Sequence, residues 1–279
     1  MKPDLHCHSH FSDGKHSPQF LIERALANAV SHLAITDHDC VAACANLPLV
    51  DGLVLIQGVE ISCSWLEKEI HIVGLGIDSL QPELGSLLQR QQHARRKRVQ
   101  AMHEQLEKLG TGGLLDYMEN LPCHAYTRSH VADFLVAQGR CKSRQKAFKS
   151  YLGKRGKIFV DSQWCSLPQA IAAIVEAGGI AVLAHPGRYP LGKTKLQQLI
   201  QDFAAAGGEA LEASYGNIDP IMKNQLTGLA QQYQLYLSLG SDFHDAAAHW
   251  TDVGRVPAFN AADEINAIWH HPRWHFGLS

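Results

Sequence analysis

The chain has 279 residues, of which 46% are hydrophobic and 19% are charged, as in a globular protein that buries one extensive core. With a formal net charge of -2, the protein has no global basic field that would hold long nucleic acid by counterion release, so any nucleotide substrate must be bound by local groups. The N-terminus lacks the apolar segment of a signal peptide, and no apolar run approaches the roughly 18 residues of a membrane span, so we expect a cytoplasmic protein without a membrane partner.

Short apolar runs alternate with helical stretches, a pattern typical of repeated βα units and a parallel sheet or barrel. After the first run, Ser17 and Pro18 are a plausible N-cap and first residue of a helix. The later runs are HLAITDHD, LVLIQGVEIS, EIHIVGLGID, GIAVLAHPGR, ALEASYG and LYLSLGSDFH. Nearly all of them finish in His, Asp or Glu. Because reactive groups of α/β barrels lie at the carboxyl ends of strands, we expect these residues to converge on one mouth.

The alternation lapses between residues 82 and 160, where a long charged helix precedes helical patches near 127–138 and 143–152. We therefore predict a barrel domain formed by residues 1–81 and 161–279, with a helical insertion subdomain at residues 82–160. The insertion carries a basic run, Arg95 to Arg98, which we interpret as a solvated helix face rather than a phosphate-binding patch. After the insertion, LPQAIAAIVEAGG predicts a capped amphipathic helix.

The strongest local motif is His6-Cys7-His8 at the end of the first apolar run. Alternate residues of a strand point the same way, so the two imidazoles can face one metal ion while Cys7 points away. Asp13 follows in a Ser-Asp-Gly loop. Its carboxylate is either a metal ligand or part of an ordinary turn.

The next apolar runs repeat this placement. His38 lies at the end of the second, Glu60 near the end of the third, and His71 inside the fourth. Taken alone, His71 would be interpreted as a hydrogen-bonded core histidine. Asp37 and Asp39 flank His38, and we favour roles in a turn or a helix cap over roles in orienting a ligand.

The second half of the chain adds His130, His185, and the pair Asp242 and His244. The pair has the same alternating geometry as His6 and His8. Buried carboxylates and imidazoles are costly unless a positive charge balances them, and divalent cations supply that charge. The 17 histidines therefore favour a metal site. The seven cysteines contain no CxxC pair, so we interpret them as reduced, mostly buried residues.

The motifs HxH, DG, TDHD, GVE, a strand histidine, AHP and GSDFH, in this order, resemble the polymerase and histidinol phosphatase (PHP) family over nearly the whole chain. GVEIS, VLAHPGRY and SLGSDFH most resemble its nucleoside 3',5'-bisphosphate phosphatase branch, also called RNase AM. The resemblance implies an α/β fold, a distorted (β/α)7 barrel, with a trinuclear metal centre.

The resemblance also implies a set of metal ligands. One ion would be held by His6, His8, Glu60 and Asp242, a second by Asp13, His38 and His244, and a third by the bridging Glu60 with His71 and His130. His130 depends on an alignment inside the insertion, so a histidine on the surface of a helix is the alternative there. Nitrogen and oxygen ligands favour Mn²⁺ or Zn²⁺ and remain compatible with Fe²⁺ or Mg²⁺, and we expect two to three ions.

Four further residues are candidates for contact with the substrate. His185 is not needed for these ligand sets, so we predict that it hydrogen-bonds the phosphate or protonates the leaving oxygen, with support of a metal ligand as the alternative. Arg128 and Arg188 could bind a phosphate with two hydrogen bonds, and Lys154 could reach a second phosphate. Arg128 is the strongest of these candidates for the catalytic site. Glu212 and Tyr215 are interpreted as structural residues or pocket walls.

The branch resemblance implies a phosphoesterase that removes the 3'-phosphate from nucleoside 3',5'-bisphosphates and trims short oligoribonucleotides from 5' to 3'. The mild net charge suits such short substrates. One alternative is a histidinol-phosphate phosphatase with the same metals. Another is a metal-stabilised module without catalytic activity, whose mark would be missing ligands. The sequence does not determine the native metal or the oligomeric state.

Overall fold

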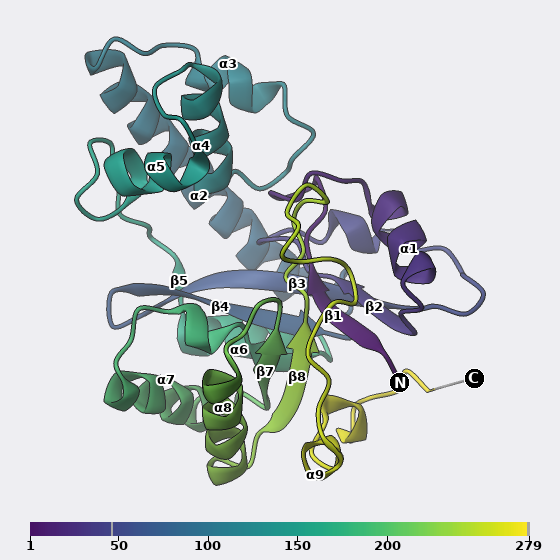
Figure 1. The fold of residues 1–279 in the computed structure, drawn as a ribbon. Coiled ribbons are helices and arrows are strands. Elements are labelled where there is room, and N and C mark those ends of the chain that lie inside the picture. The colour runs from purple at the N-terminus through teal and green to yellow at the C-terminus, as the bar shows by residue number, and fades with distance from the viewer. Residues whose placement is uncertain (46, 278–279) are drawn as a thin grey trace.

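The computed structural model describes residues 1–45 and 47–277. Within them one sheet has the strand order β1-β2-β3-β4-β6-β7-β8, and the short β5 pairs with β3. Helices lie around this sheet (Figure 1). The strands are β1 (Pro3–Cys7), β2 (His32–Ile35), β3 (Val54–Trp65), β4 (Lys68–Leu75), β5 (Cys165–Ser166), β6 (Ile180–Leu183), β7 (Ala210–Tyr215) and β8 (Tyr236–Gly240).

The sheet nearly closes into a barrel because its two outer strands, β1 and β8, meet at their carboxyl ends. There the N–H of Asp242 donates to the carbonyl of His6 at 2.8 Å, and the N–H of His8 donates to the carbonyl of Phe243 at 2.9 Å. The predicted distorted α/β barrel is confirmed. Closure also brings the last motif of the chain beside the first.

Strand β4 is the source of the distortion, because it runs antiparallel to both β3 and β6. A two-residue turn links β3 to β4, and its residues Leu66 and Glu67 have φ of 44° and 59°, as in a type I' hairpin. β3 therefore continues past Glu60, so the prediction that the third strand ends near this residue is wrong. The register of the hairpin places Glu60 and His71 on the same face of the sheet.

Most of the helices that lie outside residues 82–160 pack on the outside of the sheet. Ser17 caps the first of them by accepting a hydrogen bond from the Phe20 N–H at 3.2 Å, as predicted, and Ser166 with Gln169 forms a capping box at α6. These helices and short 3-10 turns are α1 (Pro18–Ala27), η1 (Ala42–Cys44), α6 (Leu167–Glu176), η3 (Pro186–Arg188), α7 (Lys193–Ala205), α8 (Pro220–Gln232), α9 (Ala261–Glu264) and η4 (Ile268–His270).

A second group of helices lies on the side of the sheet away from α7 and α8 (Figure 1). It consists of α2 (Pro82–Lys108), α3 (Leu114–Glu119), α4 (Arg128–Ala137), α5 (Arg144–Ala147) and the π-helical turn η2 (Phe148–Leu152). Val99, Met102 and Phe134 belong to an apolar cluster of this group, whereas Leu84 and Leu88 of α2 pack in the largest cluster of the barrel. Since α2 spans both clusters, we propose that residues 82–160 are an insertion tied to the barrel by the first half of α2.

Arg95 and Arg98 lie on the buried side of α2, so the prediction of a solvated face is wrong for these two residues. Their exposed fractions are 5% and 8%, and their guanidinium carbons lie 4.7 and 5.6 Å from the ring centroid of Trp164. Helical residues three positions apart share a face. The intervening Arg96 and Lys97 are exposed.

The seven cysteines are free thiols, and four of them are buried, in agreement with the interpretation as reduced residues. Cys7 points away from its histidine neighbours, because its thiol donates to the carbonyl of Ala34 at 3.4 Å within an apolar cluster. In the described part of the chain, no helix combines the length and the apolar character that crossing a bilayer requires.

Candidate metal centre

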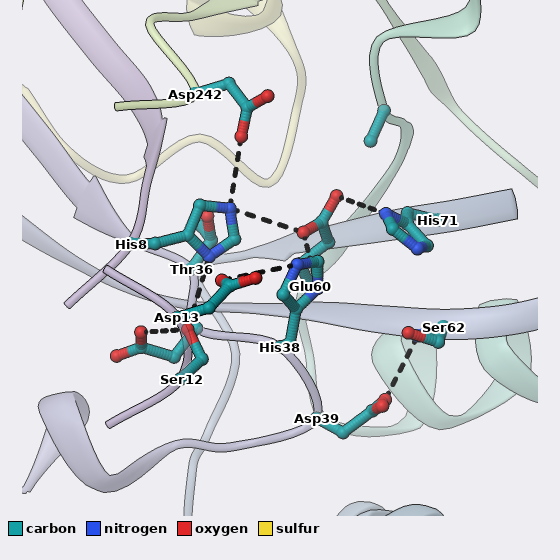
Figure 2. A network of polar contacts seen from close by, with 12 residues as sticks. His8, Ser12, Asp13, Thr36, His38, Asp39, Glu60, Ser62, His71 and Asp242 are labelled. Carbon is teal, nitrogen blue, oxygen red and sulfur yellow. Dashed lines mark hydrogen bonds and ion pairs between the residues drawn. The ribbon is translucent and has the colours of Figure 1, made fainter. Parts of the chain in front are cut away.

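Glu60 lies at the centre of a cluster of imidazoles inside the barrel (Figure 2). Its side chain is completely buried. Each carboxylate oxygen faces several histidine nitrogens: Oε1 lies 2.9 Å from His185 Nε2, 3.0 Å from His71 Nδ1 and 3.4 Å from His6 Nε2, and Oε2 lies 2.8 Å from His38 Nδ1 and 3.4 Å from His8 Nε2. A carboxylate in this position can bridge cations.

His6 and His8 project from the end of β1 toward the same point. Both are buried, and their Nε2 atoms are 3.2 Å apart. Asp242 approaches from the end of β8, with Oδ1 3.6 Å from His6 Nε2 and 3.2 Å from His8 Nε2. The φ of Asp242 is 50°, a strained backbone conformation of the kind that clusters at functional sites. These three residues and Glu60 form the first predicted ligand set.

Asp13 faces two further histidines. Its Oδ1 lies 3.7 Å from His38 Nε2 and 3.3 Å from His244 Nε2, and the ring of His244 stacks on that of His8 at 4.2 Å. The loop that carries Asp13 is therefore folded back onto the cluster, and the structure brings the second predicted ligand set together.

His130 and His185 have different surroundings in the structure. His130 lies in the first turn of α4, where its Nδ1 accepts a hydrogen bond from the Thr127 N–H at 3.1 Å, and none of the candidate metal groups contains it. His185, predicted to contact the substrate or to support a metal ligand, contacts Glu60 beside His71, and the candidate metal groups do not contain it either. The loop after β6 thus adds one more histidine to the cluster around Glu60.

Carboxylates outside the predicted ligand sets support the cluster. Glu212 on β7 lies 3.1 Å from His6 Nδ1 and accepts the backbone N–H of His185 at 2.6 Å. Sequence reasoning missed this role, although the position of Glu212 near a strand end was the same signal that identified the ligands. Asp37 accepts hydrogen bonds from the Ser9 and Ser12 hydroxyl groups, both at 2.6 Å, which fits the favoured role in a turn.

Asp39 connects the cluster to the helical group. It accepts the backbone N–H of Ser62 at 3.0 Å and a hydrogen bond from Arg95 Nε at 2.8 Å. Arg95 Nη2 also donates to the Ser62 hydroxyl at 2.7 Å. Asp39 follows His38 directly, and Ser62 lies two residues after Glu60, so α2 is bonded to both segments that carry ligands.

Burial and charge shift the pKa of several members of the cluster. Burial lowers the pKa of His6, but the charges of Glu212 and Glu60 outweigh burial and raise it to about 10. For His71, burial also lowers the pKa and Glu60 raises it, to about 9. Burial lowers the pKa of His185 to about 4. The carboxylates of the cluster therefore favour positive charge near them.

The residues fit divalent cations. Asp13 Oδ1, His38 Nδ1, Glu60 Oε2 and His185 Nδ1 are buried and, despite their close neighbours, make no hydrogen bond of adequate geometry in the described residues; such groups are rare unless another partner satisfies them. Three groups offer ligand atoms within 4.8 Å of one another: His8, Asp13, His38 and His244; His6, His8 and Glu60; and His38, Glu60 and His71. Imidazole and carboxylate ligands suit manganese, iron and zinc.

The cluster opens into a cavity of about 220 Å³, here called the mouth, which Arg95, Arg98 and Arg128 also line. Arg98 and Arg128 continue into an adjacent cavity of about 570 Å³, here called the basic cavity, which Lys68 and Lys154 line as well. Arg128 Nη2 donates to Glu69 at 3.0 Å. Of the predicted phosphate-binding residues, Arg128 thus reaches the mouth, Lys154 lies in the basic cavity, and Arg188 donates to Asp242.

Known proteins resemble the chain over nearly its whole length. The PHP domain model matches residues 4–161. The 5'-3' exoribonuclease Rnm of Escherichia coli K12 is 41% identical, with 97% of this chain and 94% of the relative covered. A 3',5'-nucleoside bisphosphate phosphatase of Chromobacterium violaceum is also 41% identical, with 91% and 90% covered.

Two solved structures share the fold. An amidohydrolase from Chromobacterium violaceum, solved with bound sulfate and no metal, superposes with a TM-score of 0.86 at 37% identity, over 96% of this chain and 95% of the other. A protein from Bifidobacterium adolescentis, proposed to be a metal-dependent phosphoesterase, gives a TM-score of 0.79 at 26% identity, with 94% of each chain covered.

The barrel, the buried cluster of histidines and carboxylates and these relatives define the class of this protein, a hydrolase of phosphate esters. The chain belongs to the PHP domain family.

Proposed function

We propose that the protein hydrolyses the 3'-phosphate of nucleoside 3',5'-bisphosphates and trims short 5'-phosphorylated oligoribonucleotides from the 5' end in the cytoplasm. The observation that carries the proposal is the continuity of the metal centre, the mouth and the basic cavity through Arg98 and Arg128. A substrate with two phosphates can place one at the cluster and the other among the cations. The two relatives at 41% identity support the same substrates.

The proposed ligand sets follow the distances. His6, His8, Glu60 and Asp242 would hold one ion, Asp13, His38 and His244 a second, and Glu60, His71 and His185 a third, with His185 in place of the predicted His130. Mn²⁺ or Zn²⁺ remains our favoured metal. Bound divalent ions would lower the pKa of water toward neutrality and neutralise charge on the phosphate.

The chain's own groups orient the substrate. Arg128 and Lys154 would hold the phosphate that is not cleaved, and Arg188 would contact the reacting phosphate from the side of Asp242. Water adds to phosphorus, the bond from phosphorus to O3' breaks, and the leaving O3' takes up a proton. In an oligoribonucleotide, cleavage of the same bond releases a nucleoside 5'-monophosphate.

Histidinol phosphate is a weaker candidate substrate, because it carries one phosphate and leaves the cations of the basic cavity without a partner. A module without catalytic activity is disfavoured, since the cluster opens into a cavity that a substrate can enter. Chelation with EDTA separates these alternatives: both enzymes would lose phosphate release, whereas such a module would have none to lose.

The test is phosphate release with Mn²⁺ from adenosine 3',5'-bisphosphate, AMP, histidinol phosphate and a short 5'-phosphorylated RNA. We expect the bisphosphate and the RNA to be preferred, and His8→Ala and Asp242→Ala to lose both activity and bound metal. His93→Ala, an exposed histidine of α2, is the control and should keep both. Preference for histidinol phosphate would contradict the proposed substrate, and full metal content in both variants would contradict the ligand set.

A further inference from the structure

A third cavity adjoins the metal centre on the side of Asp242. It has a volume of about 640 Å³ and is lined by Arg188, Tyr215, Asn217, Met222 and Trp250, among others. Its size lies within the usual range for small-molecule pockets. We propose that this aromatic cavity binds the nucleotide that follows the scissile phosphate in an oligoribonucleotide, an inference that rests on the proposed function.

Arg188 joins the aromatic cavity to the metal centre. Its guanidinium donates to the carboxylate of Asp242 and, at 3.0 Å, to the carbonyl of Gly216, and it lies 5.0 Å from the ring centroid of Tyr215. These contacts fix the orientation of the group. Because a guanidinium has five N–H donors, others remain for a phosphate oxygen between the cluster and the cavity.

One short loop borders both the aromatic cavity and the basic cavity. Gly187 and Arg188 line the aromatic cavity, whereas the next residues, Tyr189 and Pro190, line the basic cavity. This division matches the substrate. In an RNA, the reacting phosphorus joins O3' of the leaving nucleotide to O5' of the next nucleotide, so the two nucleotides extend from it in different directions. If the leaving nucleotide keeps its 5'-phosphate in the basic cavity, the next nucleotide enters the aromatic cavity.

The lining suits a nucleobase better than another phosphate. Arg188 is the only cationic side chain among the residues that line the cavity, and Asp219 adds a carboxylate. Trp250 is 56% exposed, so a large indole face is available to a ligand. Every nucleobase can stack on an aromatic ring, since each base has a π face. The cavity would therefore bind the second nucleotide with little sequence preference.

A bisphosphate has no second nucleotide, so the cavity should affect only the RNA reaction. The test compares kcat/KM for a 5'-phosphorylated trinucleotide with kcat/KM for adenosine 3',5'-bisphosphate. Trp250→Ala should lower the ratio of the two values at least about five-fold, as expected for the loss of one base stack. Ile265→Ala is the matched control, because Ile265 is 72% exposed near the residues that pair with the start of β8, away from the mouth.

A second measurement uses the unchanged protein and does not depend on the folding of a variant. A trinucleotide with an abasic second residue should be cleaved at least about five-fold more slowly than the normal trinucleotide. In Trp250→Ala the abasic substrate should show little further loss, because the two changes remove the same contact. An unchanged ratio in the variant, or equal cleavage of the normal and abasic substrates, would overturn the inference while leaving the proposed function intact. Failure to cleave either substrate would instead contradict the proposed function.

Discussion

Glu212 holds His6 in place through the imidazole nitrogen that faces away from the metal centre. The distance from Glu212 Oε1 to His6 Nδ1 is 3.1 Å, and both side chains are buried. An acceptor at Nδ1 fixes the proton there and leaves Nε2 free for a cation, which is how outer carboxylates orient metal-binding histidines. The same residue accepts the backbone N–H of His185.

Glu212→Ala should therefore weaken binding of Mn²⁺ roughly 10- to 100-fold, because His6 loses its fixed orientation. Titration of the metal-free protein with Mn²⁺, followed by calorimetry, measures the change. Glu209→Ala is the control, since Glu209 immediately precedes β7 and contacts Arg273 and His271. Equal affinity in the two variants would show that Glu212 does not orient the metal centre.

Substitution of His185 should lower the metal content, whereas substitution of His130 should lower the stability of the fold. His185→Ala should lower the metal content by one ion per chain and reduce phosphate release, because Nε2 at 2.9 Å from Glu60 is lost. His130→Ala should keep its metal and lower the free energy of unfolding by about 0.5 to 2 kcal/mol, since the capping bond with Thr127 is lost. Elemental analysis and urea unfolding distinguish the two variants. Loss of an ion in His130→Ala alone would restore the original assignment of the third ligand set.

Arg95 should contribute strongly to stability, unlike its neighbour Arg96. Arg95→Ala leaves the buried carboxylate of Asp39 without its cation, and breaking a buried pair costs roughly 3 to 5 kcal/mol. Arg96→Ala changes an exposed side chain and should stay within about 0.5 kcal/mol of the unchanged protein. Denaturant unfolding of both variants gives the comparison. A small effect of Arg95→Ala would mean that α2 is not bonded to the barrel through Asp39 as described.

The carboxylate of Asp133 should make the stability of the protein depend on pH. Burial raises the pKa of Asp133, but hydrogen bonds from Arg144 and Lys15 outweigh burial and lower it below 3.8. A group with a lowered folded pKa stabilises the protein above its unfolded pKa, and this contribution is lost as pH falls through the folded pKa. Asp133→Asn should therefore be less stable near pH 6, and the difference from the unchanged protein should shrink below about pH 4.

Thermal unfolding between pH 3 and 7 measures this dependence. Asp51→Asn, at an exposed position, serves as the control and should follow the unchanged protein throughout. A difference between Asp133→Asn and the unchanged protein that stays constant with pH would exclude the ionised carboxylate as its source.

The amino-acid sequence determined the features that depend on local periodicity. His6 and His8 alternate along one strand, and Asp242 and His244 flank Phe243 in the same way, so their spacing alone predicts that each pair faces one point. The cap at Ser17 is likewise local, because one hydroxyl bonds an N–H three residues away. These motifs also carried the family resemblance, and with it the fold.

Only the tertiary structure shows which distant residues meet one another at the cluster. The sequence contains both His130 and His185, and the family pattern favoured His130 as the ligand. In the structure, the closed sheet brings His185 next to Glu60, which lies 125 positions away in the chain. It likewise buries Arg95 against Asp39, 56 positions away. A local pattern states which way a side chain points from its own element. Which other element it meets depends on strand order and barrel closure, and these follow from packing of the whole chain.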